Sequence, residues 1–121
     1  MLVVDDEVAI LRAAEVVLHQ AGYQALTAAN VSEALLHFER HHDKLSAVVT
    51  DIMMPSGDGR QFITMLYAQS PRLPIIAMTG GTTRAFQGEV HKRGARAKLG
   101  KPFSPEELLS ATAKALDETI P

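Results

Sequence analysis

The residues best suited to chemistry in this 121-residue chain are three aspartates, a threonine and a lysine. Asp5 and Asp6 follow a short apolar run at the start of the chain, and Asp51 follows a second such run. Thr79 and Lys101 each follow a further one. Carboxylates are hard oxygen ligands that suit Mg²⁺, which often bridges to a phosphate, and a carboxylate can itself act as a nucleophile. With a lysine and a hydroxyl nearby, the set predicts a site that binds a phosphoryl group.

Charge repulsion sharpens this prediction. Two carboxylates about 4 Å apart repel each other by about 4 kcal/mol at an effective dielectric constant near 20. If Asp5, Asp6 and Asp51 meet, Lys101 alone offsets only part of their repulsion, so the cluster needs a further cation. With no His or Cys beside them in the sequence, these ligands favour Mg²⁺ over a softer metal.

The elements that must position these residues follow from the periodicity of the apolar positions. Short apolar runs alternate with segments of helical spacing along the whole chain. The expected strands are 1–4, 23–28, 47–50, 74–78 and 95–99. The expected helices lie between them, at about 10–21, after 30–32, at about 62–70 and, more weakly, at 84–93, with a last one after 104.

This alternation predicts an α/β fold. Strands that are apolar throughout are typical of a parallel sheet covered by helices on both faces. Five βα units are too few to close an eightfold barrel, so we expect an open, doubly wound parallel sheet. The functional crevice of such a sheet lies at the carboxyl ends of its strands, where all the candidate residues fall.

Helix-capping residues support the same division. Gly22 is suited to end the first helix, and Asn30 or Ser32 to begin the second. Ser104 and Glu107 flank a proline in the pattern of a capping box, which predicts the start of the last helix.

Composition limits the function classes. The net charge is −2, which argues against a nucleic-acid-binding surface, and the absence of cysteine excludes disulfides and thiol chemistry. The apolar runs are too short to span a bilayer, so we expect no membrane association and a cytoplasmic location. We expect one domain over residues 1–121, either a whole protein or a segment of a longer one.

Each motif has a simpler interpretation when taken alone. Asp5 and Asp6 could stabilise a helix N-terminus, and Thr79 could belong to a turn before two glycines. His37 and His41 have the spacing of helical metal ligands, but no third ligand is evident and a solvated helix face is the better interpretation. The joint placement of four polar strand ends on one edge favours the phosphoryl site.

Four motifs carry a resemblance to a known family. The chain is similar over its whole length to the receiver domain of bacterial two-component response regulators. The matching motifs are Leu2-Val3-Val4-Asp5-Asp6-Glu7, Thr50-Asp51-Ile52-Met53-Met54-Pro55, Ile76-Ala77-Met78-Thr79 and Lys101-Pro102-Phe103. The resemblance implies a flavodoxin-like (βα)₅ fold with strand order 2-1-3-4-5.

The resemblance also implies roles. Asp51 is the implied phosphoacceptor, with the phosphoryl group coming from a histidine kinase or a histidine phosphotransfer protein. Asp6, Asp51 and the backbone carbonyl of Met53 are the implied Mg²⁺ ligands, with Asp5 acting through water. The implied protein is a signalling domain rather than an enzyme that turns over a separate substrate.

Further implied roles concern the switch. Lys101 pairs with the phosphoryl group, Thr79 hydrogen-bonds it, and the Lys101–Pro102 peptide is cis. The surface formed by the fourth helix, fifth strand and fifth helix then relays the signal, with a homodimer through that surface as one outcome. Lys98 occupies the switch position that usually holds an aromatic residue, and because burying an ammonium group is costly we expect it to point outward.

Two rival functions share these residues. A phosphatase with an aspartyl nucleophile typically places a second aspartate two positions later as general acid, where this chain has Met53, which cannot transfer protons. A degenerate receiver that only binds partners would lack the acceptor, a metal-binding aspartate or the lysine. Asp6, Asp51 and Lys101 are all present, which disfavours that alternative.

Overall fold

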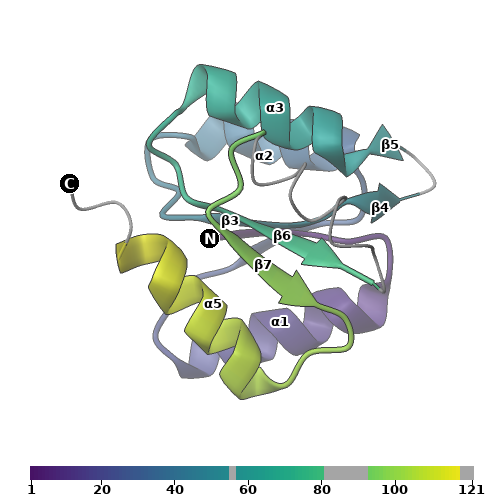
Figure 1. The fold of residues 1–121 in the computed structure, drawn as a ribbon, viewed down its shortest axis with the longest axis vertical. Helices are drawn as coiled ribbons and strands as arrows, with labels where there is room; N and C mark the ends of the chain where they lie inside the picture. Colours follow the sequence, from purple (N-terminus) through teal and green to yellow (C-terminus); the bar gives the residue numbers. More distant parts are fainter. Residues whose placement is uncertain (55–56, 81–92, 118–121) are drawn as a thin grey trace.

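The computed structural model describes residues 1–54, 57–80 and 93–117 (Figure 1). Its elements are β1 (Leu2–Val4), α1 (Val8–Gln20), β2 (Leu26–Ala28), α2 (Val31–His41), β3 (Val48–Asp51), β4 (Met53–Met54), β5 (Gly57–Asp58), α3 (Gly59–Gln69), β6 (Ile75–Thr79), β7 (Ala97–Gly100) and α5 (Pro105–Asp117). Almost all of the helix expected at 84–93 lies outside the described residues.

The main sheet has five strands in the order β2-β1-β3-β6-β7, and all of its neighbouring pairs are parallel. Counted within this sheet alone, the order is 2-1-3-4-5, as expected. The strands are numbered up to β7 because a separate two-stranded antiparallel hairpin, β4–β5, comes between β3 and β6 along the chain. The hairpin was not predicted from the sequence.

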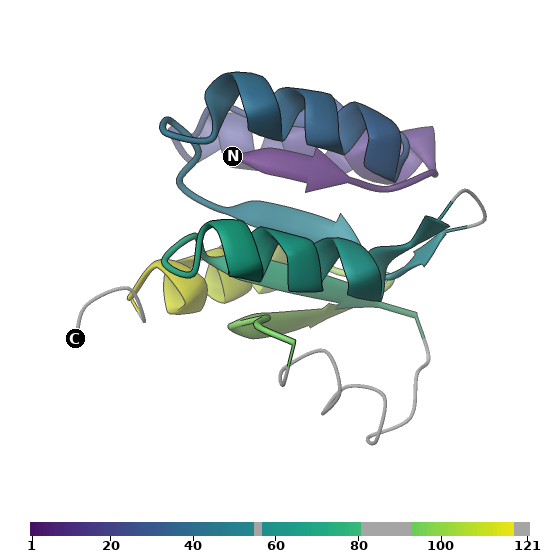
Figure 2. The same ribbon diagram turned by 90° about the horizontal axis from the view of Figure 1, so that it is seen from above.

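Helices cover both faces of the sheet, which confirms the doubly wound architecture. Figure 1 shows α2 and α3 on one side of the strands and α1 and α5 on the other, and Figure 2 shows the same layers from above. The inner strand β1 illustrates why its sequence is apolar at every position. Leu2 and Val4 pack into the core under α2 and α3, whereas Val3 packs into the core under α1 and α5.

The helix ends follow their capping residues. Asn30, rather than Ser32, is the N-cap of α2, since its side-chain oxygen accepts a hydrogen bond of 2.8 Å from the Glu33 N–H. The capping box before α5 is formed, with Glu107 N–H donating to Ser104 Oγ at 3.1 Å and Ser104 N–H donating to Glu107 Oε1 at 2.9 Å. Gly22 follows α1 with φ +94°, a conformation that glycine adopts without a steric penalty.

Strand β2 is shorter than the expected 23–28 because it pairs only with β1. The register joins Leu2 to Leu26 and Val4 to Ala28, so the residues before Leu26 have no parallel partner along a three-residue β1. The described helices are also short, with α1 and α5 the longest at 13 residues each. None of those in the described part of the chain combines the length and apolar character needed to cross a membrane.

Candidate functional site at the carboxyl edge of the sheet

The strand register brings the candidate residues to one edge. Val4 lies opposite Thr50, so Asp5 and Asp51 leave neighbouring strands at the same level. On the other side of β3, Asp51 lies opposite Met78, one residue before Thr79. The parallel pairing of β1, β3, β6 and β7 therefore brings the candidate residues together as predicted, because the carboxyl ends of parallel strands lie at one edge of the sheet.

A single lysine joins the two buried carboxylates. Lys101 Nζ donates to Asp5 Oδ2 and to Asp51 Oδ2, each at 3.0 Å. The Asp5 and Asp51 side chains are 0% and 2% exposed, and that of Lys101 is 14% exposed. Charge-assisted hydrogen bonds of this kind are stronger than neutral ones, and they give each buried charge a partner.

The other oxygen of each carboxylate is held by the backbone. Asp5 Oδ1 accepts the Glu7 N–H at 2.9 Å, and Asp51 Oδ1 accepts the Met53 N–H at 3.1 Å. Each carboxylate therefore has one oxygen fixed by the chain two residues later and one oxygen facing the lysine. This fixes the orientation of both acidic groups before any ligand arrives.

The buried negative charges of this site favour the binding of a cation. Burial raises the pKa of Asp5, and the charge of Asp51 adds to that effect, while hydrogen bonds from Glu7 and Lys101 oppose it. Burial acts to lower the pKa of Lys101, but its hydrogen bonds and ion pairs with Asp5 and Asp51 outweigh burial and raise it. Lys101 therefore stays charged. Its contact with Asp5 does not fully offset the effect of burial on that carboxylate.

A metal cation fits this edge. Ligand oxygens of Asp5, Asp6 and Asp51 all lie within 4.8 Å of one another, with Asp6 exposed and the other two buried. The cluster is the only group of three or more potential ligands among the described acidic and histidine side chains. Three carboxylates against one lysine leave an excess of two negative charges. An all-oxygen donor set open to solvent at Asp6 suits Mg²⁺, which keeps several of its waters.

Thr79 and Lys101 are linked through their backbones. The Lys101 N–H donates to the Thr79 carbonyl at 2.8 Å, which continues the pairing of β6 with β7 beyond Gly100. Thr79 is buried, with 3% of its surface exposed. The Lys101–Pro102 peptide is cis, the isomer that the resemblance implies.

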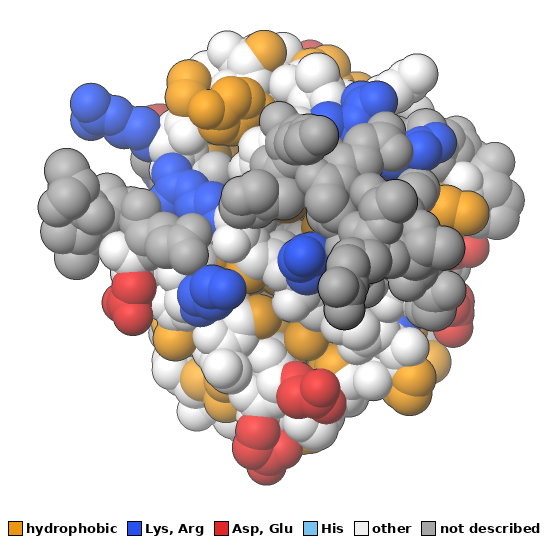
Figure 3. Space-filling model, viewed as in Figure 1, with side chains coloured by type: hydrophobic (Ala, Val, Ile, Leu, Met, Phe, Trp, Pro, Cys, Tyr) orange, Lys and Arg blue, Asp and Glu red, His pale blue; other side chains and the backbone are white. Residues whose placement is uncertain are grey.

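Lys98 lies on the edge strand β7 and is exposed. The hydrogen bonds to the Asp51 carboxylate come from the Met53 N–H and from Lys101. Figure 3 shows this face of the molecule, with several basic side chains around β7 and acidic ones nearer α1 and α5. The exposure of Lys98 is consistent with the expectation that its side chain points outward.

Sequence reasoning missed two members of this edge. A Cβ on Gly59 would lie 2.6 Å from the Cα of Ile52 and closer still to the Asp51 carbonyl, so α3 can begin there only with glycine. Glu7 belongs to the first of the four motifs with no role predicted for it, yet its carboxylate lies 3.6 Å from Lys101 Nζ. The glycine resembled one more turn residue, and an exposed glutamate at a helix start carries no distinctive signal.

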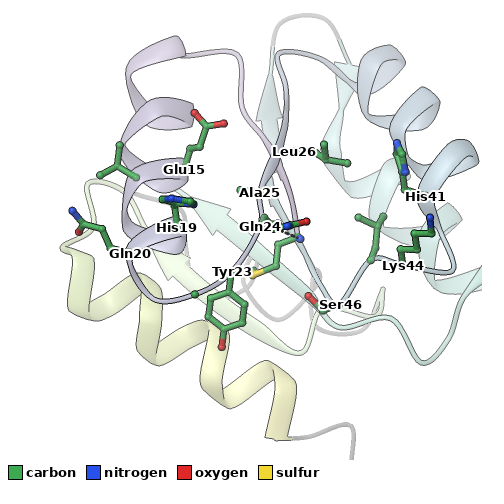
Figure 4. Close-up of a pocket in the computed structure, with 14 residues that line it drawn as sticks. Glu15, His19, Gln20, Tyr23, Gln24, Ala25, Leu26, His41, Lys44 and Ser46 are labelled. Carbon is green, nitrogen blue, oxygen red and sulfur yellow. Dashed lines mark hydrogen bonds between the residues drawn. The ribbon is translucent and has the colours of Figure 1, made fainter.

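A separate hollow lies at the opposite edge of the sheet. It has a volume of about 940 Å³ and is lined by the amino ends of β1 and β2 and by neighbouring parts of α1 and α2, including Met1, Tyr23, Gln24 and Leu26 (Figure 4). His41 lines this hollow, and its ring stacks on that of His37 with centroids 6.4 Å apart. No cluster of three metal ligands forms there among the described residues.

The sequence matches the response regulator receiver domain family over residues 1–113. A probable transcriptional regulator, ycf27, of Cyanophora paradoxa is 40% identical over 119 residues, which cover 98% of this chain and 48% of that protein. The alkaline phosphatase synthesis transcriptional regulatory protein PhoP of Bacillus subtilis is 34% identical, with 96% and 47% covered. The chain thus spans about half the length of these relatives.

Solved structures agree with the sequence match. A response regulator receiver domain protein from Clostridium thermocellum superposes with a TM-score of 0.89 at 29% identity, covering 97% of this chain and 93% of that one. The chemotaxis protein CheY4 of Vibrio cholerae gives 0.88 at 32% identity, covering 95% and 96%. A beryllofluoride-activated NtrC4 receiver domain dimer gives 0.87 at 34% identity, covering 98% and 96%.

Proposed function

This chain belongs to the response regulator receiver domains, and from that premise we propose that Asp51 accepts a phosphoryl group from a histidine kinase or a histidine phosphotransfer protein. The observation that carries the proposal is the way Asp51 is held. One of its oxygens is fixed by the Met53 N–H, and the other lies 3.0 Å from the Lys101 ammonium group at an edge of the sheet that Asp6 opens to solvent.

The reaction is an in-line transfer. A carboxylate oxygen of Asp51 bonds to phosphorus as the P–N bond of the donor's phosphohistidine breaks, and the leaving imidazole nitrogen takes a proton from solvent. Lys101 turns from Asp51 Oδ2 to the phosphoryl oxygens and neutralises part of their charge. The Met53 N–H keeps the other carboxylate oxygen in place, which lowers the cost of orienting the nucleophile.

We propose Mg²⁺ as the resident cation. Asp6, Asp51 and the backbone carbonyl of Met53 would hold it, with Asp5 acting through water. When bound, the ion neutralises charge that develops on the transferring phosphoryl group. The close set of three carboxylate oxygens supports this assignment, because their repulsion falls when a cation joins them.

The output follows from a shift between two states. We propose that Thr79 hydrogen-bonds the phosphoryl group and moves toward it, which changes the surface of the fourth helix, β7 and α5. Lys98 stays in solvent in both states. A homodimer through this surface is one outcome, consistent with the dimer in which the NtrC4 receiver domain was solved.

We further propose that residues 1–121 act as one cytoplasmic receiver domain, with no membrane or nucleic-acid contact of its own. Its chemistry is limited to its own phosphorylation and dephosphorylation. Because Met53 occupies the position of a phosphatase's general acid, steady turnover of small phosphoesters is not expected. Sustained phosphate release from such esters would favour the enzyme alternative.

The test is phosphorylation by a small donor. The wild-type chain, treated with phosphoramidate and Mg²⁺, should gain the mass of one phosphoryl group in an intact mass spectrum. Asp51→Asn should gain none, and it should stay folded because the amide is nearly isosteric with the carboxyl group. Asp43→Asn, an exposed change away from the site, serves as the control and should be phosphorylated normally. A full extra phosphoryl group on Asp51→Asn would overturn the assignment.

A further inference from the structure

Glu7 breaks a local rule at the start of α1. It is the N-cap of the helix, a position that favours Ser, Thr, Asp or Asn, and its side chain makes no capping hydrogen bond. Its backbone is nevertheless fully used. The Glu7 carbonyl accepts the Ile10 and Leu11 N–H groups at 3.1 and 3.2 Å, and its N–H donates to Asp5. The Glu7 carboxylate therefore makes no hydrogen bond to the helix N-terminus, whereas the backbone of Glu7 is held by hydrogen bonds.

That carboxylate points to the central lysine. Glu7 Oε1 lies 3.6 Å from Lys101 Nζ, within ion-pair range but longer than the 3.0 Å contacts of the two buried aspartates. The Glu7 side chain is 62% exposed. Of the three carboxylates around Lys101, Glu7 is thus the loosest and the one that can leave without exposing a buried charge.

A phosphoryl group on Asp51 needs the same ammonium group. Lys101 Nζ donates hydrogen bonds to Asp5 and Asp51, and it also forms the longer ion pair with the exposed carboxylate of Glu7. An incoming anion must therefore compete with Glu7 for Lys101 and also approach its negative charge. Both effects act against the anion, whereas the same negative charge favours a metal cation.

We propose that Glu7 is a positioning residue that holds Lys101 in the unphosphorylated state and lowers the affinity of the pocket for phosphoryl-like anions. This inference rests on the proposed function of Asp51. It assigns Glu7 opposite effects on the two ligands of the pocket. Replacing the carboxylate should strengthen anion binding and weaken Mg²⁺ binding, which a purely structural role in helix capping would not do.

The test uses beryllofluoride, an anionic phosphoryl mimic, at saturating Mg²⁺, with binding followed by backbone amide shifts. Glu7→Gln should lower the dissociation constant of beryllofluoride by roughly two- to fivefold, the range that measured exposed ion pairs span. Its dissociation constant for Mg²⁺ alone should rise by a similar factor. Glu15→Gln makes the same charge change two turns further along α1, on an exposed side chain, and should change neither constant by more than a fraction of this.

Glu7→Asp separates contact from charge. Aspartate keeps the charge but is shorter and prefers to cap the helix, so its carboxylate should leave Lys101. Its affinity for beryllofluoride should therefore rise toward that of Glu7→Gln. Equal beryllofluoride affinity in wild type, Glu7→Gln and Glu7→Asp would overturn the inference and leave the proposed function intact. A wild-type chain that binds no beryllofluoride would overturn both.

Discussion

The two edges of the parallel sheet differ in how they treat charge. At the amino edge, the hollow beside β1 and β2 is about 940 Å³ in volume, but its charged side chains, such as Glu15 and Lys44, are exposed. The Met1 ammonium group is the exception, since it donates to the Gln24 carbonyl at 2.6 Å and burial lowers its pKa. At the carboxyl edge, two carboxylates with 0% and 2% exposure share one lysine.

This difference shows which feature marks a site. Buried like charges cost free energy in the folded state, and a fold keeps them where a ligand compensates for that cost. The chemistry of the carboxyl edge is therefore a better guide to function than the size of the cavity at the amino edge.

The largest expected effect comes from removing the shared cation. Lys101→Met leaves Asp5 and Asp51 buried without a positive partner, and breaking a buried ion pair typically costs about 3–5 kcal/mol in free energy of unfolding. Urea unfolding should show a loss near the lower value, because Lys101 is partly exposed, and added Mg²⁺ should restore part of it.

Lys98→Met is the matched control, since Lys98 is exposed on β7 and its replacement should change stability by no more than about 0.5 kcal/mol. If Lys101→Met lowered the free energy of unfolding no more than Lys98→Met, Asp5 and Asp51 would not need Lys101 to offset their buried charge. The contrast between the two edges would then fail.

Gly59→Ala tests the backbone contact beneath Asp51. The new methyl group would meet Ile52 and the Asp51 carbonyl, and such overpacking typically costs about 1–3 kcal/mol. Displacement of Asp51 should also slow its phosphorylation. Gly100→Ala, which meets no heavy atom within 4 Å, should be tolerated. Thermal unfolding and phosphorylation rates measure both effects, and a neutral Gly59→Ala would contradict the described approach of α3 to β3.

The pH dependence should place Lys101 in its ionic network. Because its pKa is raised in the folded state, the stability it contributes is fully present below the ordinary value of 10.5 and is lost as the pH rises through the raised value. The difference in unfolding free energy between wild type and Lys101→Met should thus stay constant from neutral pH up to about 10.5 and shrink above it. Shrinkage already near pH 8 would show that the lysine pKa is lowered instead.

Asp6→Asn should give the smallest effect on stability, with a positive sign. Its carboxylate lies within 4.8 Å of the other two, so its removal relieves up to about 1 kcal/mol of repulsion at the dielectric constant of water. Thermal unfolding without metal should shift upward, while the affinity for Mg²⁺ falls. Asp43→Asn provides the same charge change on an exposed loop. A loss of stability in Asp6→Asn would show that no repulsion exists at this edge.

Most of the fold could be predicted because the inner strands β1, β3 and β6 are buried at every position. An apolar run such as that of β3 leaves few alternatives, and the cap at Ser104 marks the last helix directly. The hairpin β4–β5 could not be predicted, since two-residue strands have no periodicity to detect. The length of β2 depended on its partner, which a local pattern does not contain.

The candidate site could also be predicted only in part. Asp5, Asp51 and Lys101 could be identified because polar residues directly after buried strands meet at one edge of a parallel sheet. Glu7 and Gly59 could not, because their importance lies in contacts made across the fold. A carboxylate 3.6 Å from a lysine that is distant in sequence, and a backbone that leaves no room for a Cβ, appear only once the strands are in register.

The most direct test of the contrast between the edges is a Mg²⁺ titration of the wild-type chain followed by backbone amide shifts. We expect the shifts to concentrate at Asp5, Asp6, Asp51 and Met53 and to be lost in Asp6→Ala. Residues of the amino-edge hollow, such as Tyr23 and Gln24, should not respond. Shifts centred on the amino edge, or an affinity for Mg²⁺ that Asp6→Ala leaves unchanged, would contradict this prediction.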